Sequence, residues 1–427
     1  MNQELLTYIS KSPTQFQAME TSARMLLDCG AVELHEEDAW ELVPGKTYFT
    51  TRNGSSLIAW KMLDRNFAGY LIEASHLDSP YLKIKENAEE EENGYIRLSV
   101  ERYGGMLLST WLGRPLSVAG RVTVKTENGF ELRTVDLREP VAIIPNLAPH
   151  LNDKANKDIT YNPAVDMLPL YGEGAEKGTF LDRVAKAAKA RKEDILTCEL
   201  YLYNPQPGVI WNSYVSSPRL DDLQCAFCGL KGFLAGKPSG SIPVLCLFDN
   251  EEVGSRTKQG ADSTFLPDVL ERIADALGLS KEEQKARVAQ SFMVSADNAH
   301  ALHPNHTEIR DPNHTVRMNE GIVIKYNASQ SYASDGLSAA VFQLVCEHAG
   351  VPFQRYANRA DMRGGGTLGN ISTSHVSIPT VDIGLAQLAM HSSYETAGLK
   401  DTEYLVKAFE TYFSSTLTKS GNNYSLI

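Results

Sequence analysis

The sequence predicts an α/β fold in which a mixed sheet with helices on both faces is interrupted by a β-rich insertion. Two runs, 67–76 and 241–248, are almost wholly apolar, which is typical of strands covered on both faces. In the middle of the chain, short segments of alternating polar and apolar residues replace these continuous apolar runs. We therefore predict a discontinuous domain of residues 1–84 and 213–427, with an insertion domain of residues 85–212.

The first part of the chain predicts one helix followed by two strands. Pro13 suits the opening turn of a helix that continues to Cys29, and Gly30 is a suitable C-cap. The runs 56–62 and 67–76 are rich in aliphatic and aromatic residues, as strands are. The second of them has the composition of a central strand.

The insertion begins with an acidic stretch at 86–94, which predicts a solvated loop. Alternating runs such as 95–103 and 121–137 follow and predict an antiparallel, partly open β-domain. A basic helix is expected at 180–194 and a strand at 195–204.

The α/β pattern returns from about residue 215 and continues to the end of the chain. Helical and strand patterns alternate there, as in sheets with helices on either face. We expect helices at 220–236, between 266 and 290, at 334–350 and at 401–415, and strands at 241–248, 290–296, 321–327, 351–357 and 378–385.

Composition excludes several classes of function. The 427 residues carry a formal charge of −12, which argues against nucleic acid as a partner because phosphate binding needs a positive surface. No apolar run approaches the roughly 20 residues that span a bilayer, and the N-terminus lacks the pattern of a signal peptide. We therefore expect a cytoplasmic protein that does not bind a membrane. Six cysteines are too few for a disulfide framework in a chain this long, and Cys225 with Cys228 is expected to pack in a core.

His76 and Asp78 lie where the apolar run 67–76 ends. Catalytic groups and ligands gather at the carboxyl ends of strands in α/β sheets. A histidine can bind a metal through one ring nitrogen while a nearby carboxylate orients the other. Taken alone, the pair is better explained by a surface turn.

A second cluster, Asp249, Glu251 and Glu252, follows the apolar run 241–248 directly. Three carboxylates at a buried strand end repel one another unless a cation lies among them. Adjacent glutamates on an irregular turn point in different directions, so one can bind a metal while the other acts as a base. The alternative is a solvated acidic turn.

Three further residues complete a possible ligand set. Asp297 and His391 each follow an apolar run, and Asp221 lies at a helix start, where it could also serve as a cap. Two histidines with several carboxylates suit zinc, and manganese or cobalt are possible substitutes. A carboxylate able to bridge predicts two ions about 3.5–4 Å apart. The mononuclear motif HExxH is absent.

Residues 364–369 match the pattern GxGxxG without its usual context. A polar stretch rather than a strand precedes them, and no acidic residue follows at the spacing of a ribose ligand. We interpret the segment as a glycine-rich turn that lines a pocket, in which Gly365 and Gly366 let the backbone approach a ligand closely.

Read together, six segments resemble the motifs of the aspartyl aminopeptidase family of dinuclear zinc exopeptidases, in the same order and over nearly the whole chain. They are SHLDSP, SPRLDDL, DNEEVGS, SADNAHALHPNH, GGGTLGNIS and AMHSSYE. The resemblance implies that Asp221 bridges two zinc ions, with His76 and Asp297 on one and Glu252 and His391 on the other. It gives Glu251 the role of general base and Asp78 that of orienting residue.

The resemblance also implies a homo-oligomer, a tetrahedral dodecamer assembled through the β-rich insertion. His150 is similar to a histidine that reaches a neighbouring subunit's active site, and Lys325 to a lysine near the substrate's side-chain pocket. Tyr332 is similar to a residue that donates to the developing oxyanion. The segment around residues 358–369 is closer to the bacterial branch, whereas the eukaryotic branch most clearly favours acidic residues, so both acidic and neutral first residues stay open.

The predicted reaction is hydrolysis of the N-terminal residue from a peptide, with Glu251 removing a proton from the attacking water. Two alternatives remain at this point. One is a dinuclear zinc amidohydrolase of the carboxypeptidase or deacetylase type. The other is a shell-forming binding protein without turnover.

Overall fold

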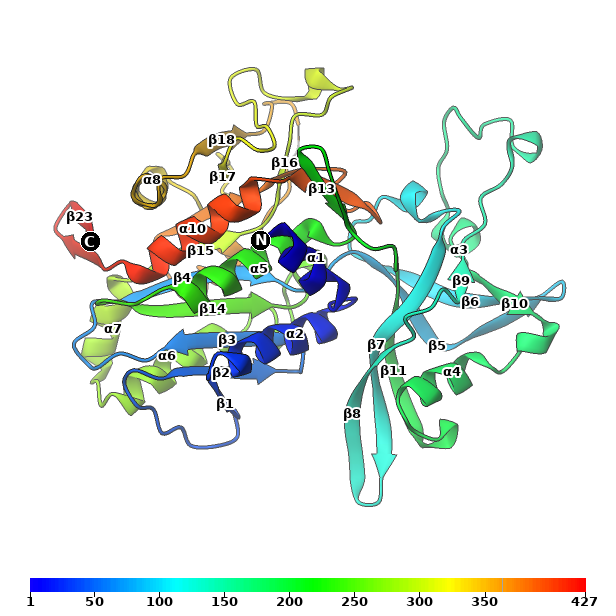
Figure 1. The fold of residues 1–427 in the computed structure, drawn as a ribbon, viewed down its shortest axis with the longest axis horizontal. Helices are drawn as coiled ribbons and strands as arrows, with labels where there is room; N and C mark the ends of the chain where they lie inside the picture. Colours follow the sequence, from blue (N-terminus) through cyan, green and yellow to red (C-terminus); the bar gives the residue numbers. More distant parts are fainter. Residues whose placement is uncertain (363) are drawn as a thin grey trace.

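The computed structural model describes residues 1–362 and 364–427. Figure 1 shows two bodies: an α/β body that contains both chain ends, and a β-rich body formed by the middle of the chain. The α/β body is built on a nine-stranded sheet with the order β1-β2-β3-β14-β4-β15-β19-β17-β18. Its strands are β1 Val32–Leu34, β2 Thr47–Arg52, β3 Ser56–Lys61, β4 Tyr70–His76, β14 Ile242–Phe248, β15 Phe292–Ala296, β17 Ile322–Tyr326, β18 Phe353–Ala357 and β19 Thr380–Gly384.

The centre of this sheet is parallel. Strands β14, β4, β15 and β19 run in one direction, whereas β3 and β17 are antiparallel to their neighbours β14 and β19. The carboxyl ends of the four parallel strands therefore meet at one edge, where ligands bind in open α/β sheets.

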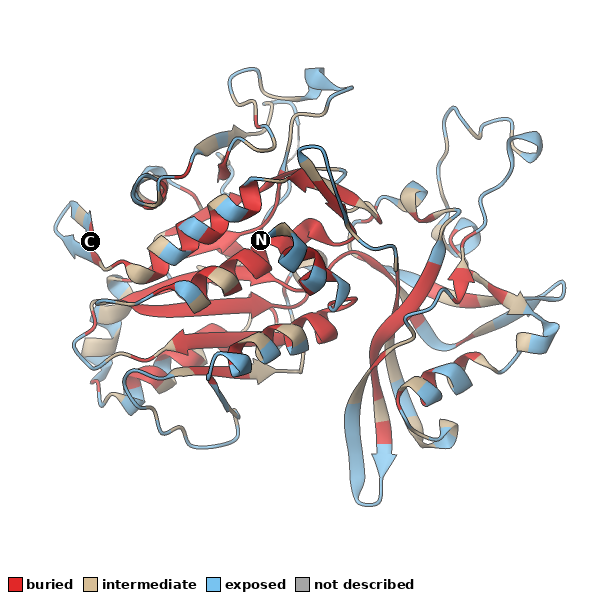
Figure 2. Ribbon diagram, viewed as in Figure 1, coloured by how far each residue is buried: buried red, intermediate tan, exposed pale blue. Residues whose placement is uncertain are grey.

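Helices cover both faces of the sheet, which confirms the predicted fold class. One core contains apolar residues of five helices, and the core on the opposite face contains those of three more. The first set is α1 Asn2–Ser10, α2 Gln15–Asp28, α5 Leu220–Ala235, α8 Gly336–Ala349 and α10 Asp401–Ser414; the second is α6 Phe265–Ala276, α7 Lys281–Ala289 and α9 Leu368–Ser372. The central strands are buried along their whole length (Figure 2).

Strand β14 has no polar face because each of its faces packs in a different core. Leu245 and Leu247 belong to the first core, while Val244, Cys246 and Phe248 belong to the second. Successive side chains of a strand point to opposite faces. Because both faces are covered, every position of β14 must be apolar.

Close packing of α5 on α10 predicts a sensitive glycine. A Cβ on Gly232 would lie 2.3 Å from the Cβ of Phe409. Gly232→Ala is therefore expected to lower the thermal unfolding midpoint, because overpacking costs about 1–3 kcal/mol and exceeds the helix-propensity gain of about 1 kcal/mol. Gly336→Ala is the control, since nothing lies within 4 Å of its Cβ position at the start of α8. Equal midpoints for both variants in calorimetry would contradict the packing argument.

The β-rich body is a closed barrel rather than the partly open domain that the sequence predicted. Its strand order is β11-β5-β6-β10-β9-β7-β8, and β7 also pairs with β11 over eight residue pairs. That pairing joins strands more than 70 residues apart, and it closes the ring. The strands are β5 Tyr81–Glu92, β6 Tyr95–Tyr103, β7 Pro115–Thr126, β8 Gly129–Asp136, β9 Ala142–Ile143, β10 Leu170–Glu173 and β11 Ile195–Tyr203.

Two predictions for this body were wrong in detail. The acidic stretch belongs to β5 instead of a loop, and one of its carboxylates supports a helix. Glu89 Oε1 accepts from the backbone N–H of Phe180, 2.7 Å away, at the start of α4. A carboxylate is favourable at a helix N-terminus. Helix α4 spans Phe180–Ala187 and is shorter than predicted, since a separate 3-10 turn covers Lys192–Asp194.

The remaining elements are short. A five-stranded sheet consists of β12 Val209–Trp211, β13 Tyr214–Ser217, β16 Ala299–His300, β20 Ala386–Leu388 and β21 Glu395–Gly398. A hairpin of β22 Leu417–Ser420 and β23 Asn423–Leu426 ends the chain, and α3 is a single turn, Pro163–Asp166. Among the described residues, no helix has both the length and the apolar character to cross a bilayer.

Candidate metal centre

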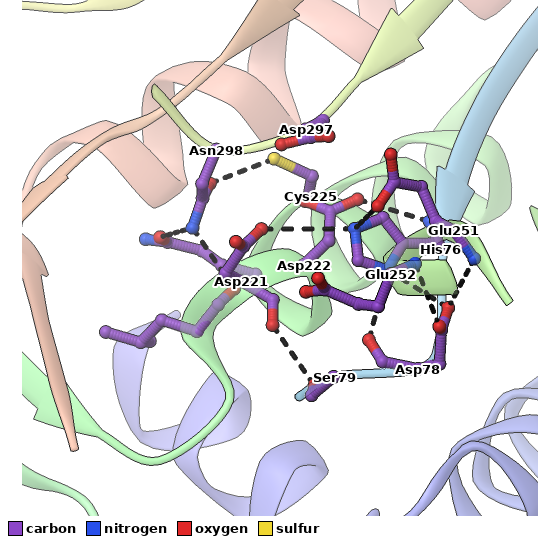
Figure 3. Close-up of polar contacts among 12 residues, drawn as sticks. His76, Asp78, Ser79, Asp221, Asp222, Cys225, Glu251, Glu252, Asp297 and Asn298 are labelled. Carbon is purple, nitrogen blue, oxygen red and sulfur yellow. Dashed lines mark hydrogen bonds and ion pairs between the residues drawn. The ribbon is translucent and has the colours of Figure 1, made fainter. Parts of the chain in front are cut away.

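The structure brings all five predicted ligands together at the carboxyl edge of the large sheet. Three groups of side chains each offer ligand atoms within 4.8 Å of one another. Asp221 belongs to two of these groups, once with His76 and Asp297 and once with Glu252 and His391. Figure 3 shows Asp221, Glu252 and Asp297 around His76, with Glu251 beside them.

Each side chain is delivered by the end of a regular element. His76 is the last residue of β4, Asp297 directly follows β15, and Asp221 lies at the start of α5. Glu251 and Glu252 open a 3-10 turn, Glu251–Val253, directly after β14. The strand ends therefore fix the places from which these side chains reach the centre.

Left-handed backbone occurs at two of these turns. Asn250 has a φ of 64° and His391 a φ of 66°, a region that residues other than glycine rarely adopt. Asn250 turns the chain sharply after β14, so that the two glutamates face the cluster. Such conformations cost about 1–3 kcal/mol each and persist where the surroundings enforce them.

Distances inside the cluster divide it into two halves. His391 Nε2 lies 3.3 Å from Asp221 Oδ2 and 3.4 Å from Glu252 Oε1. On the other side, His76 Nε2 lies 4.0 Å from Asp221 Oδ1 and 3.9 Å from Glu251 Oε2. Asp221 thus presents one carboxylate oxygen to each histidine.

Asp78 lies under the cluster and holds its parts by hydrogen bonds. Its carboxylate accepts from the backbone N–H groups of Glu251 and Glu252, both at 3.1 Å. Its backbone oxygen lies 3.0 Å from Nδ1 of His76. Asp78 therefore hydrogen-bonds to three site residues, His76, Glu251 and Glu252, without belonging to any of the three ligand groups.

Burial and mutual repulsion dominate the electrostatics of the carboxylates. Burial raises the pKa of Glu251 to about 8, with repulsion from Asp297 adding to the effect and His76 opposing it. Burial also raises the pKa of Glu252 well above its usual range. For Asp221, burial alone would raise the pKa, but its contact with His391 and the charges of His76 and Lys325 together lower it.

The histidines show the complementary effect. Burial alone would lower the pKa of His391, but its contacts with Asp221 and Glu252 raise it to about 10. The carboxylates around His76 likewise hold its pKa well above the usual range. Protons therefore balance the negative charge of this cluster, and bound cations would displace them.

The donor set fits divalent metal ions. Asp221 Oδ1 and Glu252 Oε1 are buried without a hydrogen-bond partner among the described residues. Buried polar atoms almost always have a partner, so these two oxygens have the character of ligand atoms. Histidine nitrogen with carboxylate oxygen is the combination found at catalytic zinc sites.

A cavity of about 290 Å³ opens onto the cluster. Its wall includes four residues that the sequence predicted for substrate contact or catalysis: Lys325, Tyr332, Gly365 and Gly366. The other lining residues that are not proposed ligands or bases are Asn298, Ala299, His300, Tyr356, Thr367 and Met390.

Lys325 is buried and already paired. Its Nζ donates to the backbone oxygen of Asn298 at 2.8 Å and lies 3.4 Å from Oδ1 of Asp297. The ammonium also lies 5.5 Å from the ring centroid of Tyr332. Lys325 therefore fixes the Asp297 carboxylate as well as lining the cavity.

His150 is not brought to the centre of its own chain. It lies on an exposed 3-10 turn, Pro149–Leu151, of the β-rich body and does not line the cavity. Its predicted role in a neighbouring subunit's site stays a prediction.

Sequence reasoning assigned no role to Glu395, which ties two ligand loops together. Its carboxylate accepts from the backbone N–H of His391 at 2.7 Å and of Asp221 at 3.0 Å. It is buried in β21, and burial raises its pKa to about 8. The available signal was its position four residues after His391, at the end of the motif AMHSSYE.

Comparisons with known proteins point to one family. The family model described as "Aminopeptidase I zinc metalloprotease (M18)" matches residues 8–413. A protein of Clostridium acetobutylicum described as "Probable M18 family aminopeptidase 2" is 43% identical over 423 residues, covering 96% of this chain and 98% of that protein. A protein of Mycobacterium leprae with the same description is 38% identical and covers 97% and 98%.

Solved structures agree with this assignment. A chain of the cryo-EM structure of the Ape4 and Nbr1 complex superposes with a TM-score of 0.92 at 33% identity, over 96% of this chain and 85% of that one. The S. cerevesiae mApe1 dodecamer structure gives a TM-score of 0.83 at 28% identity, over 96% and 95%. These matches confirm the resemblance and the enzyme class inferred from the six motifs, and the chain therefore belongs to the M18 family of zinc metallo-aminopeptidases.

Proposed function

We propose that this enzyme hydrolyses the peptide bond after the first residue of a peptide, with Glu251 as general base. The observation that carries the proposal is the gathering of six metal-binding or basic side chains from five separate chain segments, all but Glu252 at the wall of one cavity. The cavity has a volume of about 290 Å³, which admits a residue at the end of a chain.

We propose that the site holds two zinc ions, for which manganese or cobalt can substitute. Asp221 is shared, His76 and Asp297 hold one ion, and Glu252 and His391 hold the other, in agreement with the two groups that contain Asp221. When bound, the ions supply Lewis acidity that polarises the scissile carbonyl and makes water more acidic.

Glu251 is the carboxylate left for proton transfer. It lies at the cavity wall, and its backbone N–H is held by Asp78. Glu251 removes a proton from the attacking water and later passes it to the leaving amine. Tyr332, which also lines the cavity, donates a hydrogen bond to the oxygen on which negative charge develops.

The substrate's first side chain lies, in this proposal, between Lys325 and the backbone of Gly365 and Gly366. No side chain projects from either glycine, so a ligand can approach the backbone closely. A panel of chromogenic amides of Asp, Glu, Leu, Ala and Lys measures whether an acidic or a neutral first residue is preferred. A higher kcat/KM for Asp or Glu supports the assignment of Lys325 as a specificity residue.

Paired peptides with and without an N-acetyl group test the reaction itself. The free peptide should be hydrolysed at least about 100-fold faster, because a blocked amine leaves charged groups of the site unpaired, at a cost of about 3 kcal/mol. Equal rates would instead indicate an amidohydrolase of the carboxypeptidase or deacetylase type. No hydrolysis of either peptide with zinc, manganese or cobalt would indicate a binding protein.

We further propose that the chain assembles as a tetrahedral homododecamer through the insertion of residues 85–212, with residues 1–84 and 213–427 forming the catalytic domain. The mApe1 dodecamer and the exposed position of His150 support this proposal. Light scattering should give about 565 kDa for twelve copies of the 47.1-kDa chain. If His150 serves a neighbour's site, His150→Ala should lower kcat/KM without dissociating the particle.

A further inference from the structure

The β-rich body contacts the metal centre of its own chain through residues 103–107, which begin at the last residue of β6. This 103–107 segment contacts the loops that follow β4 and β14 and the loop that contains His391. Three of its residues hydrogen-bond to the loops that carry proposed ligands, and a fourth packs against Glu252.

Tyr103 connects two loops of the centre through its hydroxyl. The oxygen lies 2.8 Å from Oδ2 of Asp78 and 2.8 Å from Nδ2 of Asn250. Oδ1 of Asn250 accepts from Thr257 and Gln259, so its amide group must turn Nδ2 toward Tyr103. Because the tyrosine oxygen accepts that bond, its single proton is donated to Asp78.

Through Asp78, this hydrogen bond also affects the turn Glu251–Val253, which carries Glu251 and Glu252. The same carboxylate of Asp78 accepts the backbone N–H groups of Glu251 and Glu252. Asp78 and Asn250 lie at the ends of two parallel strands, β4 and β14, and the Tyr103 hydroxyl is a bridge between them. Loss of the hydroxyl would leave both groups with one partner fewer.

The same segment orients His391. The backbone oxygen of Gly105 lies 2.7 Å from Nδ1 of His391, and the N–H of Leu107 donates to its backbone oxygen at 3.0 Å. A hydrogen on Nδ1 leaves the lone pair of Nε2 free to face Asp221 and Glu252. At Gly104, with a φ of 78°, a Cβ would lie 3.1 Å from that of Glu252, so a larger residue would crowd Glu252 and strain the backbone.

We propose that the 103–107 segment is part of the active site and that Tyr103 is a positioning residue for the metal ligands. The β-rich body then has a second role besides assembly, because it holds the ligand turn after β14 and the ring of His391 in the geometry that binds metal. This inference rests on the ligand assignment proposed above.

The test is Tyr103→Phe in the full-length protein, with Tyr201→Phe as the matched control. Both rings lie in one aromatic cluster, 5.6 Å apart, but the Tyr201 hydroxyl bonds to Gln15, far from the ligands. Zinc affinity is measured by competition with a chelator on metal-free protein, and kcat and KM are measured at saturating zinc. We expect Tyr103→Phe to bind zinc about 10- to 100-fold more weakly, with a lower kcat and an unchanged KM, and the control to match the wild type.

Zinc affinity and kcat within twofold of the wild type would overturn the proposal, as would equal losses in both variants, which would indicate a general weakening of the aromatic cluster. Thermal midpoints of the two variants show whether stability differs, and the competition is run below both midpoints. Zinc affinity is independent of the reaction. If neither wild type nor variant hydrolyses peptides, the proposed function fails, whereas the binding comparison still decides the role of Tyr103.

Discussion

Glu251→Gln is expected to lower kcat by about 100- to 10,000-fold, the range that a general base contributes. Gln keeps the size of the side chain but cannot accept the water's proton. Glu251 is not among the five proposed ligands, so zinc should remain bound at the wild-type stoichiometry. The backbone bond to Asp78 is also retained, because it involves only the N–H of residue 251.

Steady-state kinetics and metal analysis of the same preparation measure both parts of this prediction. Glu271→Gln is the control, since it makes the same change on the exposed face of α6. If Glu251→Gln retained kcat within a few-fold of the wild type, another group would be the base. Loss of zinc from the variant would instead make Glu251 a ligand.

Asp221→Asn is expected to remove bound zinc and to lower kcat/KM by about 1,000-fold or more. Asp221 faces both histidines through different oxygens, so an amide removes the charge that both ions share. Metal ions supply several kcal/mol of transition-state stabilisation, and each 1.36 kcal/mol is a factor of ten in rate. The fold should persist, because the apolar cores on the two faces of the large sheet do not include Asp221.

Zinc per chain, measured after extensive dialysis, decides this prediction together with activity. Asp275→Asn on the exposed side of α6 is the matched control. Two zinc ions per chain in Asp221→Asn, with wild-type affinity, would show that Asp221 does not bridge them. Circular dichroism should give the same spectrum for both variants.

The central strands were predictable because strands buried on both faces consist mostly of apolar residues. The runs that end at His76 and Phe248 are almost wholly apolar, and this pattern is visible in the sequence alone. Closure of the barrel was not predictable in this way. The pairing of β7 with β11 joins residues such as Arg121 and Glu199, and nothing in either strand alone specifies so distant a neighbour.

The proposed ligands were predictable for a related reason. Each is a charged or histidine side chain directly beside a buried element, a place where such a residue is costly without a partner. Tyr103 and Gly105 carry no such signal, since a tyrosine at a strand end and a glycine after it are ordinary. Their contacts depend on how the β-rich body sits against the α/β body, and this is a property of the fold rather than of any motif.

Strand β4 lies between β14 and β15 and is covered on both faces. Its amide hydrogens should therefore exchange with solvent only through the largest opening of the molecule, since stability differs between regions and is highest in core strands. His76 is the last residue of that strand. We therefore expect this proposed metal ligand to be anchored in the part of the protein whose amides exchange most slowly. Loops around the cavity can then fluctuate without moving that ligand.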